Sequence, residues 1–94
     1  KEIAIDADYV VLSTGLRPQP EGDELAKKFK LTCNIDGFFM EAHVKLRPVD
    51  FPSEGFFLAG LAHAPKNLEE TIGQAQAAAG RAGALLSQES LTVS

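Results

Sequence analysis

The chain lacks several patterns on which whole classes of function depend. It contains one cysteine in 94 residues, which excludes an intrachain disulfide, a CxxC redox pair and a four-cysteine iron–sulfur site within it. Nine basic residues stand against thirteen acidic ones, a balance that argues against a nucleic-acid surface. No GxGxxG follows a strand-like run, so the usual dinucleotide-binding fingerprint is absent. Charged residues interrupt the longest helical pattern, so we expect no membrane span.

Size and composition are those of a small folded unit. An apolar fraction of 45% with 23% charged residues is ordinary for a globular domain. A chain of this size buries only about two thirds of its unfolded surface. The first residue is Lys1 and the only methionine is Met40, so we expect a piece cut or processed from a longer protein. We expect residues 1–94 to form one partial domain, with 88–94 as a frayed tail. No signal peptide is recognisable, and we expect a cytoplasmic protein.

Apolar runs predict a central sheet. Alternation within 1–8 is typical of a short half-buried strand, and the runs 9–13 and 56–59 are typical of strands buried on both faces. Asp36-Gly37 lies between two apolar stretches and predicts a β-hairpin over 31–46. The expected fold class is therefore α/β or α+β.

Two helices are predicted to cover this sheet. Acidic residues open and lysines close a short helix over 23–30, as the helix dipole favours. Asn67 is a good N-cap for a long helix over 67–87, and Glu70 follows three residues on, as in a capping box. An apolar stripe of this helix is predicted to face the core; it consists of Leu68, Ile72, Ala75, Ala79, Ala82 and Leu86.

Two segments, VVLSTG (10–15) and FFLAG (56–60), pass from a predicted buried strand to a glycine. In open α/β sheets, ligands gather at such strand ends and at helix N-termini. Lys66 stands just before the long helix, where a cation is unfavourable unless an anion is present, so it indicates an anionic ligand. The alternative, in which both glycines merely end strands, stays open.

These segments resemble parts of a known flavoprotein family. VVLSTGLRP is similar to the segment by which flavoproteins with two dinucleotide-binding domains return from the nicotinamide-binding to the flavin-binding domain. GFFLAGLAHAPKNLEETIGQAQAAAGRAGALL is similar to the flavin-binding segment near their C-terminus. With AH-x-PK and LRPVDF, the combination most resembles the family of the iron–sulfur flavoprotein subunit of heterodisulfide reductase, from Glu2 to Ser87.

The resemblance implies a fragment of a split, Rossmann-like FAD-binding domain that is not catalytic alone. It implies that eight residues approach FAD: Thr14, Gly15, Gly60, Leu61, His63, Lys66, Asn67 and Leu68. Leu61 stands where the family often has aspartate, which leaves only a backbone contact there. The implied parent is a flavin-dependent, iron–sulfur-linked oxidoreductase for electron transfer. Its implied partners are the remainder of the flavoprotein and other oxidoreductase subunits.

Other interpretations of the same residues stay open. Cys33 is expected to be a buried, inert thiol, and the spacing of Cys33, His43 and His63 matches no compact zinc pattern. His63 is as well explained as a surface or capping histidine. The alternative function is a non-enzymatic interaction module, a homo-oligomer that self-associates through surfaces normally buried in the parent flavoprotein.

Overall fold

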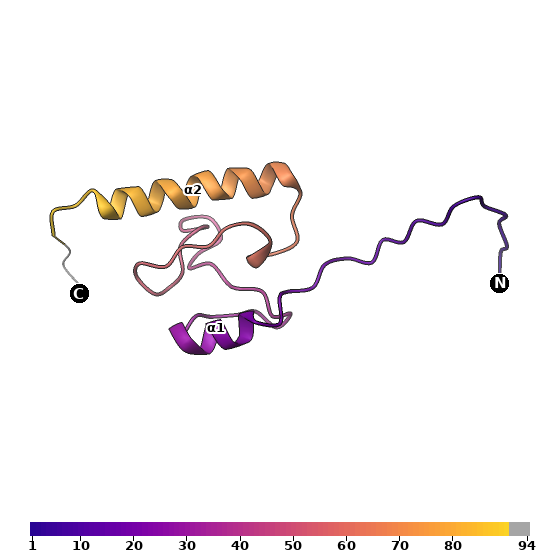
Figure 1. Ribbon diagram of the computed structural model, residues 1–94, viewed down its shortest axis with the longest axis horizontal. Helices are drawn as coiled ribbons and strands as arrows, with labels where there is room; N and C mark the ends of the chain where they lie inside the picture. The colour runs from indigo at the N-terminus through magenta and orange to yellow at the C-terminus, as the bar shows by residue number, and fades with distance from the viewer. Residues whose placement is uncertain (91–94) are drawn as a thin grey trace.

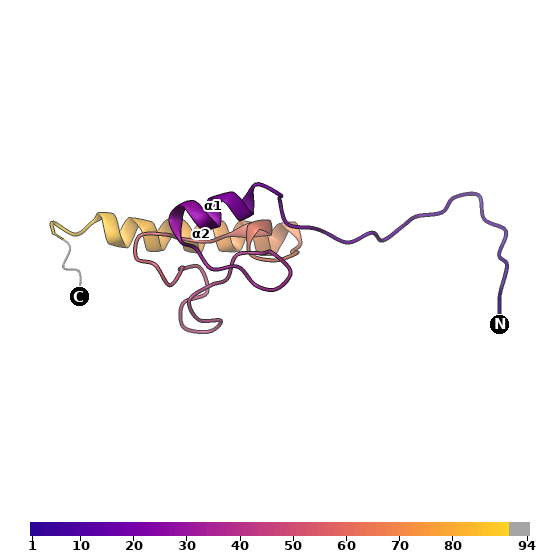
Figure 2. The ribbon, with the colours of Figure 1, turned by 90° about the horizontal axis from the view of Figure 1, so that it is seen from below.

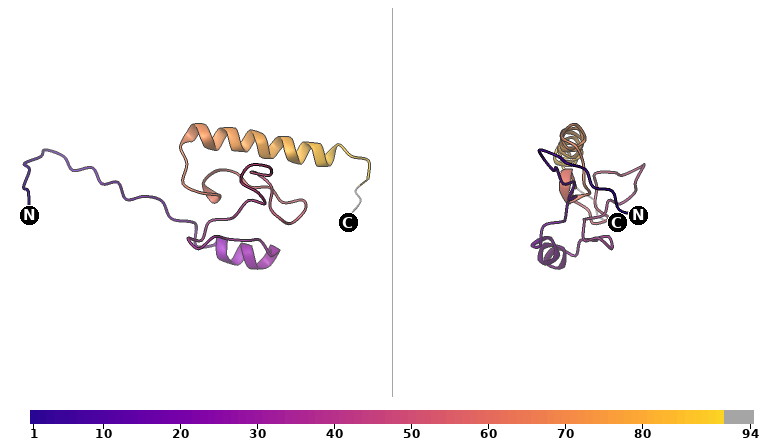
Figure 3. Two further views of the ribbon diagram at one scale, coloured as in Figure 1. Left: turned by 180° about the vertical axis from the view of Figure 1, so that it is seen from behind. Right: turned by 90° about the vertical axis from the view of Figure 1, so that its right-hand side faces the viewer.

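The computed structural model describes residues 1–90 and contains two α-helices joined by irregular chain. Helix α1 spans Gly22–Phe29, helix α2 spans Leu68–Leu86, and a short 3₁₀ helix, η1, spans Gly60–Ala62. The two α-helices lie on opposite sides of the irregular segments between them (Figure 1, Figure 3). Residues 1–15 form an arm that extends away from this body (Figure 2). The radius of gyration is consequently 18.3 Å, whereas a compact domain of about 100 residues has about 13 Å.

Helix α1 has charges that suit its dipole at both ends, although no side chain caps its N-terminus. Two acidic residues occupy its first turn and two lysines its last turn, each on the side that the helix dipole favours. Lys30 then ends the helix in the left-handed conformation, with φ of 56°, and its N–H donates to the carbonyl of Ala26. The short helix predicted from this charge pattern is confirmed.

Helix α2 begins where the sequence predicts. The Oδ1 atom of Asn67 accepts a hydrogen bond from the N–H of Glu70 at 2.8 Å, which satisfies one of the free N–H groups of the first turn. The long helix and its N-cap are confirmed. The predicted frayed tail starts at residue 88, and its residues 91–94 lie outside the described residues.

The predicted core face of α2 is wrong. Leu68 and Leu86 of the apolar stripe are 75% and 82% exposed, and no residue of α2 is buried. The helix instead turns toward the body a face that carries Gln74 and Arg81, whose side chains bond to Gly60 and to Asp50. The half-buried positions of α2 are Thr71, Gln74, Ala78, Ala82 and Leu85, so Ala82 is the one member of the predicted stripe that faces inward. Polar attachments therefore supplement a narrow apolar contact.

The small core lies between the two helices and is extended by a cluster of aromatic rings. Its buried apolar residues are Ala26, Phe38, Val49, Phe51 and Leu58. Phe51 packs edge-on against Phe39 and Phe56, with ring centroids 5.6 and 6.5 Å apart. Phe56 in turn meets Phe29 of α1 at 5.4 Å. This cluster joins α1 to the irregular segments, since paired aromatic rings add to the free energy gained by apolar burial.

The predicted central sheet is absent from residues 1–90, so the expected α/β or α+β Rossmann-like class is wrong for this chain. Strand-type pairing there is limited to isolated antiparallel bridges, namely Cys33 with Phe39, His43 with Arg47 and Asp50 with Phe57. The expected 31–46 hairpin is reduced to a turn at Asp36-Gly37 closed by the first of these bridges. The expected 56–59 strand keeps one bridge and two backbone hydrogen bonds: the Leu58 N–H donates to the Val49 carbonyl, and the Phe51 N–H donates to the Phe56 carbonyl.

The physical reason is clearest in the arm. The apolar pattern predicts strands within 1–8 and at 9–13, yet Tyr9 and Val11 are each 89% exposed. An apolar run becomes a strand only where a neighbouring strand accepts its backbone hydrogen bonds. The described residues offer no such neighbour, so the run stays extended but unpaired. Within the same residues, neither helix has the length and apolar character that a bilayer crossing requires.

Candidate functional site

Four polar side chains meet beside η1 and form the candidate site, which we call the His63 cluster: Glu41, His63, Lys66 and Gln74. The Nε2 atom of His63 lies 2.5 Å from Oε2 of Glu41, and its Nδ1 atom lies 2.9 Å from Nζ of Lys66. Gln74 of α2 places its Nε2 atom 3.3 Å from the same Nδ1. The cluster thus joins three separate parts of the chain at one imidazole ring.

Gln74 also fixes the backbone of η1. Its Oε1 atom accepts a hydrogen bond from the N–H of Gly60 at 2.9 Å. Because the amide oxygen is used in this way, the amide nitrogen of Gln74 must face the imidazole. Gly60 is buried and its φ is 75°, a conformation that suits glycine.

These bonds assign the protonation of the His63 ring. An ammonium group and an amide N–H can only donate, so Nδ1 must be the unprotonated acceptor. The proton of the neutral ring therefore sits on Nε2 and is donated to Glu41. The backbone N–H of Glu41, and then His63, lower the pKa of the Glu41 carboxyl against the opposing effect of partial burial. Glu41 is therefore an ionised acceptor that orients the imidazole.

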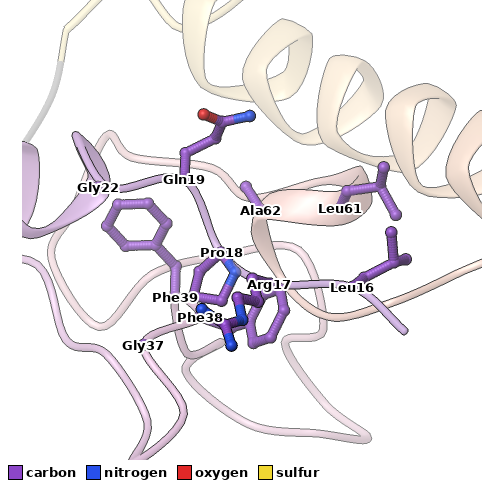
Figure 4. A pocket seen from close by; sticks show the side chains of 10 residues that line it. All are labelled: Leu16, Arg17, Pro18, Gln19, Gly22, Gly37, Phe38, Phe39, Leu61 and Ala62. Atoms are coloured by element: carbon purple, nitrogen blue, oxygen red, sulfur yellow. The ribbon is translucent and has the colours of Figure 1, made fainter. Parts of the chain in front are cut away.

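An apolar pocket of about 240 Å³ lies next to the cluster. The chain just after the arm forms one wall through Leu16 and Pro18, and η1 forms another through Leu61. Figure 4 shows Leu16 and Leu61 on one side of the pocket and Phe39 on the other. The segments that follow the two strand-like glycine ends therefore meet in space, although neither is a strand.

The predicted site residues divide into two groups. Leu61 lines the pocket, Gly60 is bonded to Gln74 of the cluster, and His63 and Lys66 are members of the cluster, which does not itself line the pocket. Asn67 and Leu68 follow directly as the N-cap and first residue of α2. Thr14 and Gly15 lie on the exposed arm, outside the pocket wall, which begins at Leu16. Gly15 has a φ of 78° and open space around its Cβ position.

Two residues of the cluster were missed at the level of sequence. Glu41 is 22 residues from His63 and stands in a segment predicted to be a hairpin strand, so nothing local marks it as a partner. Gln74 could have been found, because it lies on the same face of α2 as Thr71, one turn along from the N-terminal end that Lys66 precedes. The pattern of apolar residues placed the inner face of the helix elsewhere.

The remaining candidates have simpler structural roles. His43 Nδ1 accepts hydrogen bonds from the backbone N–H groups of Lys45 and Leu46, each at 3.2 Å, and so shapes a turn. Cys33 is half-buried, and burial, with a contribution from Asp23, raises the pKa of its thiol. A raised thiol pKa lowers the thiolate fraction and supports the expected inert role. Among residues 1–90, no group of three metal-ligating side chains gathers.

No family model matches the chain. Curated relatives do match it. It is 47% identical over 77 residues to the iron–sulfur subunit of the CoB–CoM heterodisulfide reductase of Methanocaldococcus jannaschii, a match that covers 82% of this chain and 12% of that protein. It is 51% identical over 78 residues to the corresponding subunit of the H(2):CoB-CoM heterodisulfide,ferredoxin reductase of Methanothermobacter thermautotrophicus, with 82% and 12% covered. A protein of Archaeoglobus profundus that is named for its likeness to this heterodisulfide reductase subunit is 42% identical over 86 residues, with 92% and 12% covered.

These matches confirm the resemblance found in VVLSTG and in the segment around AH-x-PK. The chain spans about 12% of the length of the relatives it matches. The similarity therefore relates this chain to one segment of those proteins.

Proposed function

We propose that this chain, related in sequence to a segment of the iron–sulfur subunit of heterodisulfide reductase, supplies one wall of a flavin site in an electron-transferring oxidoreductase. The observation that carries the proposal is that η1 lines an apolar pocket through Leu61 and Ala62 and leads directly into the bonded pair His63 and Lys66. An apolar cavity with a few convergent polar groups is the usual form of a cofactor site. The chain itself remains non-catalytic in this proposal, as expected from the sequence.

The residues present fit part of a flavin. A flavin ring has apolar faces, which match the pocket walls at Leu16 and Leu61, and an edge of carbonyl oxygens. Lys66 and the start of α2 do not line the pocket; they follow η1 in the chain and, in this proposal, meet that edge in a site larger than the pocket. The pocket, at about 240 Å³, is smaller than the 300–1,000 Å³ or so of typical ligand pockets. The pocket is therefore interpreted as one wall of a larger site. The flavin, when bound, would supply the electron transfer itself.

Charge supports the same assignment. The first turn of α2 carries free N–H groups whose partial positive charge is opposed by Glu69 and Glu70 in the same turn, and Lys66 adds a full positive charge directly before it. The direct partner of the Lys66 ammonium is a neutral imidazole, and the Glu41 carboxylate at the other ring nitrogen offsets part of the Lys66 charge. A cofactor that gains negative charge on reduction would be stabilised there.

The rest of the site, in this proposal, lies in the longer polypeptide to which the chain belongs. The matched proteins are named as subunits, one of them as the iron–sulfur subunit, of reductases that act on the CoB–CoM heterodisulfide. We propose iron–sulfur centres in that remainder, and other oxidoreductase subunits as partners. The partial-domain boundaries 1–94 and the cytoplasmic location stay predictions.

Lys66→Met in the longer polypeptide is expected to weaken flavin binding about tenfold, the factor that corresponds to one lost charge-assisted hydrogen bond of about 1.5 kcal/mol. Methionine keeps the length of the side chain and removes its charge. Titration of the flavin-free protein with FAD, followed by flavin fluorescence, measures the change. The control is Lys45→Met, at an exposed lysine outside the cluster. Equal affinities for both variants and the wild type would remove Lys66 from the site.

A second candidate function is the interaction module, and the arm favours it. Its apolar side chains are far more exposed than folded chains tolerate in a contiguous run, with Val10, Val11 and Leu12 at 78%, 89% and 74%. Extended chain with free backbone N–H and C=O groups can add to an edge of another chain. Self-association through residues 9–12 is therefore a specific alternative.

The double variant Tyr9→Ser/Val11→Ser is expected to shift the 94-residue chain from oligomer to monomer at high concentration. The double variant replaces two of the four exposed apolar side chains in residues 9–12 and so reduces the apolar area that association would bury. Light scattering after size-exclusion chromatography measures the mass. Val44→Ser is the control, because Val44 is 69% exposed outside the arm. A wild-type chain that stays monomeric at every concentration contradicts this alternative.

A further inference from the structure

We infer that His63 is a proton-controlled latch: one proton added to its Nδ1 atom releases both the Lys66 ammonium and the backbone N–H of Gly60. The inference rests on the bonds around one ring, in which each ring nitrogen has a defined role. It concerns positioning rather than chemistry at a substrate. That the released groups then face a flavin rests on the proposed function.

In the latched state the ring is neutral. Nδ1 accepts from Nζ of Lys66 at 2.9 Å and from Nε2 of Gln74 at 3.3 Å, while Nε2–H donates to Glu41. The side chains of His63 and Glu41 are 20% and 18% exposed, so the ring is held in a partly shielded place. Lys66 is tied back to the body, and the N–H of Gly60 is occupied by the amide oxygen of Gln74.

In the protonated state both bonds at Nδ1 fail together. The new N–H faces an ammonium and an amide N–H, which are donors, and the imidazolium repels the Lys66 charge. Lys66 must leave. The amide of Gln74 can satisfy the new N–H only by turning its oxygen to the ring, and this withdraws the oxygen from Gly60. A single proton from solvent therefore frees one full charge and one backbone donor.

The charged groups that face His63 oppose one another. Glu41, from the irregular segment after α1, favours the imidazolium, and Lys66, from the loop before α2, disfavours it. Helix α2 presents the uncharged Gln74, and η1 presents backbone. Because departure of Lys66 removes the opposing charge, protonation and release promote each other. Histidine is suited to this role since its charge changes between about pH 5 and pH 8.

The first test is a pH titration of the ¹⁵N-labelled 94-residue chain by NMR. It contains two histidines, and His43→Gln assigns the remaining ring signals to His63. We expect Nδ1 of His63 to be unprotonated at alkaline pH, and the Gly60 amide and Lys66 side-chain signals to shift with the His63 midpoint. Gln74→Ala should uncouple Gly60 and leave Lys66 coupled. A proton on Nδ1 at alkaline pH, or independent midpoints for Gly60 and Lys66, overturns the latch.

The second test uses the longer polypeptide without added flavin. Acetylation of Lys66 by an N-hydroxysuccinimide ester is measured by mass spectrometry relative to Lys45, which corrects for the general effect of pH on amines. We expect the ratio to rise about tenfold from about pH 8 to about pH 5, the factor for one lost hydrogen bond. In His63→Gln the ratio should stay constant. A constant ratio in the wild type overturns the latch, whereas an intact latch in a protein that binds no flavin overturns only the proposed function.

Discussion

Replacement of Asp50 by asparagine is expected to lower the free energy of unfolding of the chain by about 2 kcal/mol, because hydrogen bonds from charged donors are lost at a buried acceptor. The Asp50 side chain is 4% exposed and accepts three hydrogen bonds. Nη2 of Arg47 lies 3.1 Å from Oδ2, and Arg81 approaches both carboxylate oxygens, at 3.2 and 3.1 Å. Asparagine keeps the volume but presents a donor where these donors converge.

The effect is large because Asp50 holds α2 to the body. Arg81 belongs to α2, which has no buried residue, so this ion pair and the Gln74 bond are its main polar attachments. Urea unfolding followed by circular dichroism measures the loss. Asp36→Asn, in an exposed turn, is the matched control and is expected to change little. An unchanged midpoint for Asp50→Asn would mean that the carboxylate does not anchor the helix.

The same variant has a pH signature. Hydrogen bonds from Arg81, and then from Arg47, lower the pKa of the Asp50 carboxyl, against the opposing effect of burial. A carboxyl whose pKa is lower in the folded state stabilises the fold above its unfolded-state pKa of about 3.9, and this contribution is lost as the pH falls through the folded value. The wild type should therefore be more stable than Asp50→Asn at neutral pH, and the difference should begin to shrink below about pH 4 and vanish only as the pH falls through the lowered folded-state pKa.

Local signals predicted the helices correctly. Asn67 caps α2, and the acidic start and lysine-rich end of α1 stand where the dipole favours them. The Asp36-Gly37 turn is also present, with Gly37 at a φ of 95°. These features depend on neighbours within about four residues, which a sequence pattern records directly.

The prediction of a central sheet was wrong because a strand depends on partners that are distant in the sequence. The run 9–13 has the composition of a buried strand, but burial requires flanking strands that the described residues do not contain. The ion pair between Asp50 and Arg81 could not be predicted either, because the two residues are 31 positions apart and no sequence pattern links them. In the candidate site, Lys66 and His63 were predicted as near neighbours, whereas Glu41 required the fold.

Gly60, which the resemblance places near FAD, also has a conformational reason to be glycine. The φ of 75° is unfavourable for a residue with a side chain, and a Cβ atom there would lie 3.3 Å from Cγ2 of Thr71. The close neighbour is thus helix α2 rather than open space. The absence of a side chain lets η1 approach Thr71 in the first turn of the helix, and Gln74 in the next turn accepts the Gly60 N–H.

Gly60→Val is accordingly expected to destabilise the chain by about 3 kcal/mol, through strain at positive φ and the clash with Thr71 together. Gly55→Val is the matched control, because Gly55 has a φ of 86° but nothing within 4 Å of its Cβ position. The difference between the two variants measures the contact with α2 alone. Thr71→Ser removes the methyl group that a side chain at position 60 would meet. The double variant Gly60→Val/Thr71→Ser should therefore recover part of the stability that Gly60→Val loses. Equal losses at both glycines, with no recovery, would show that η1 does not depend on its close approach to α2.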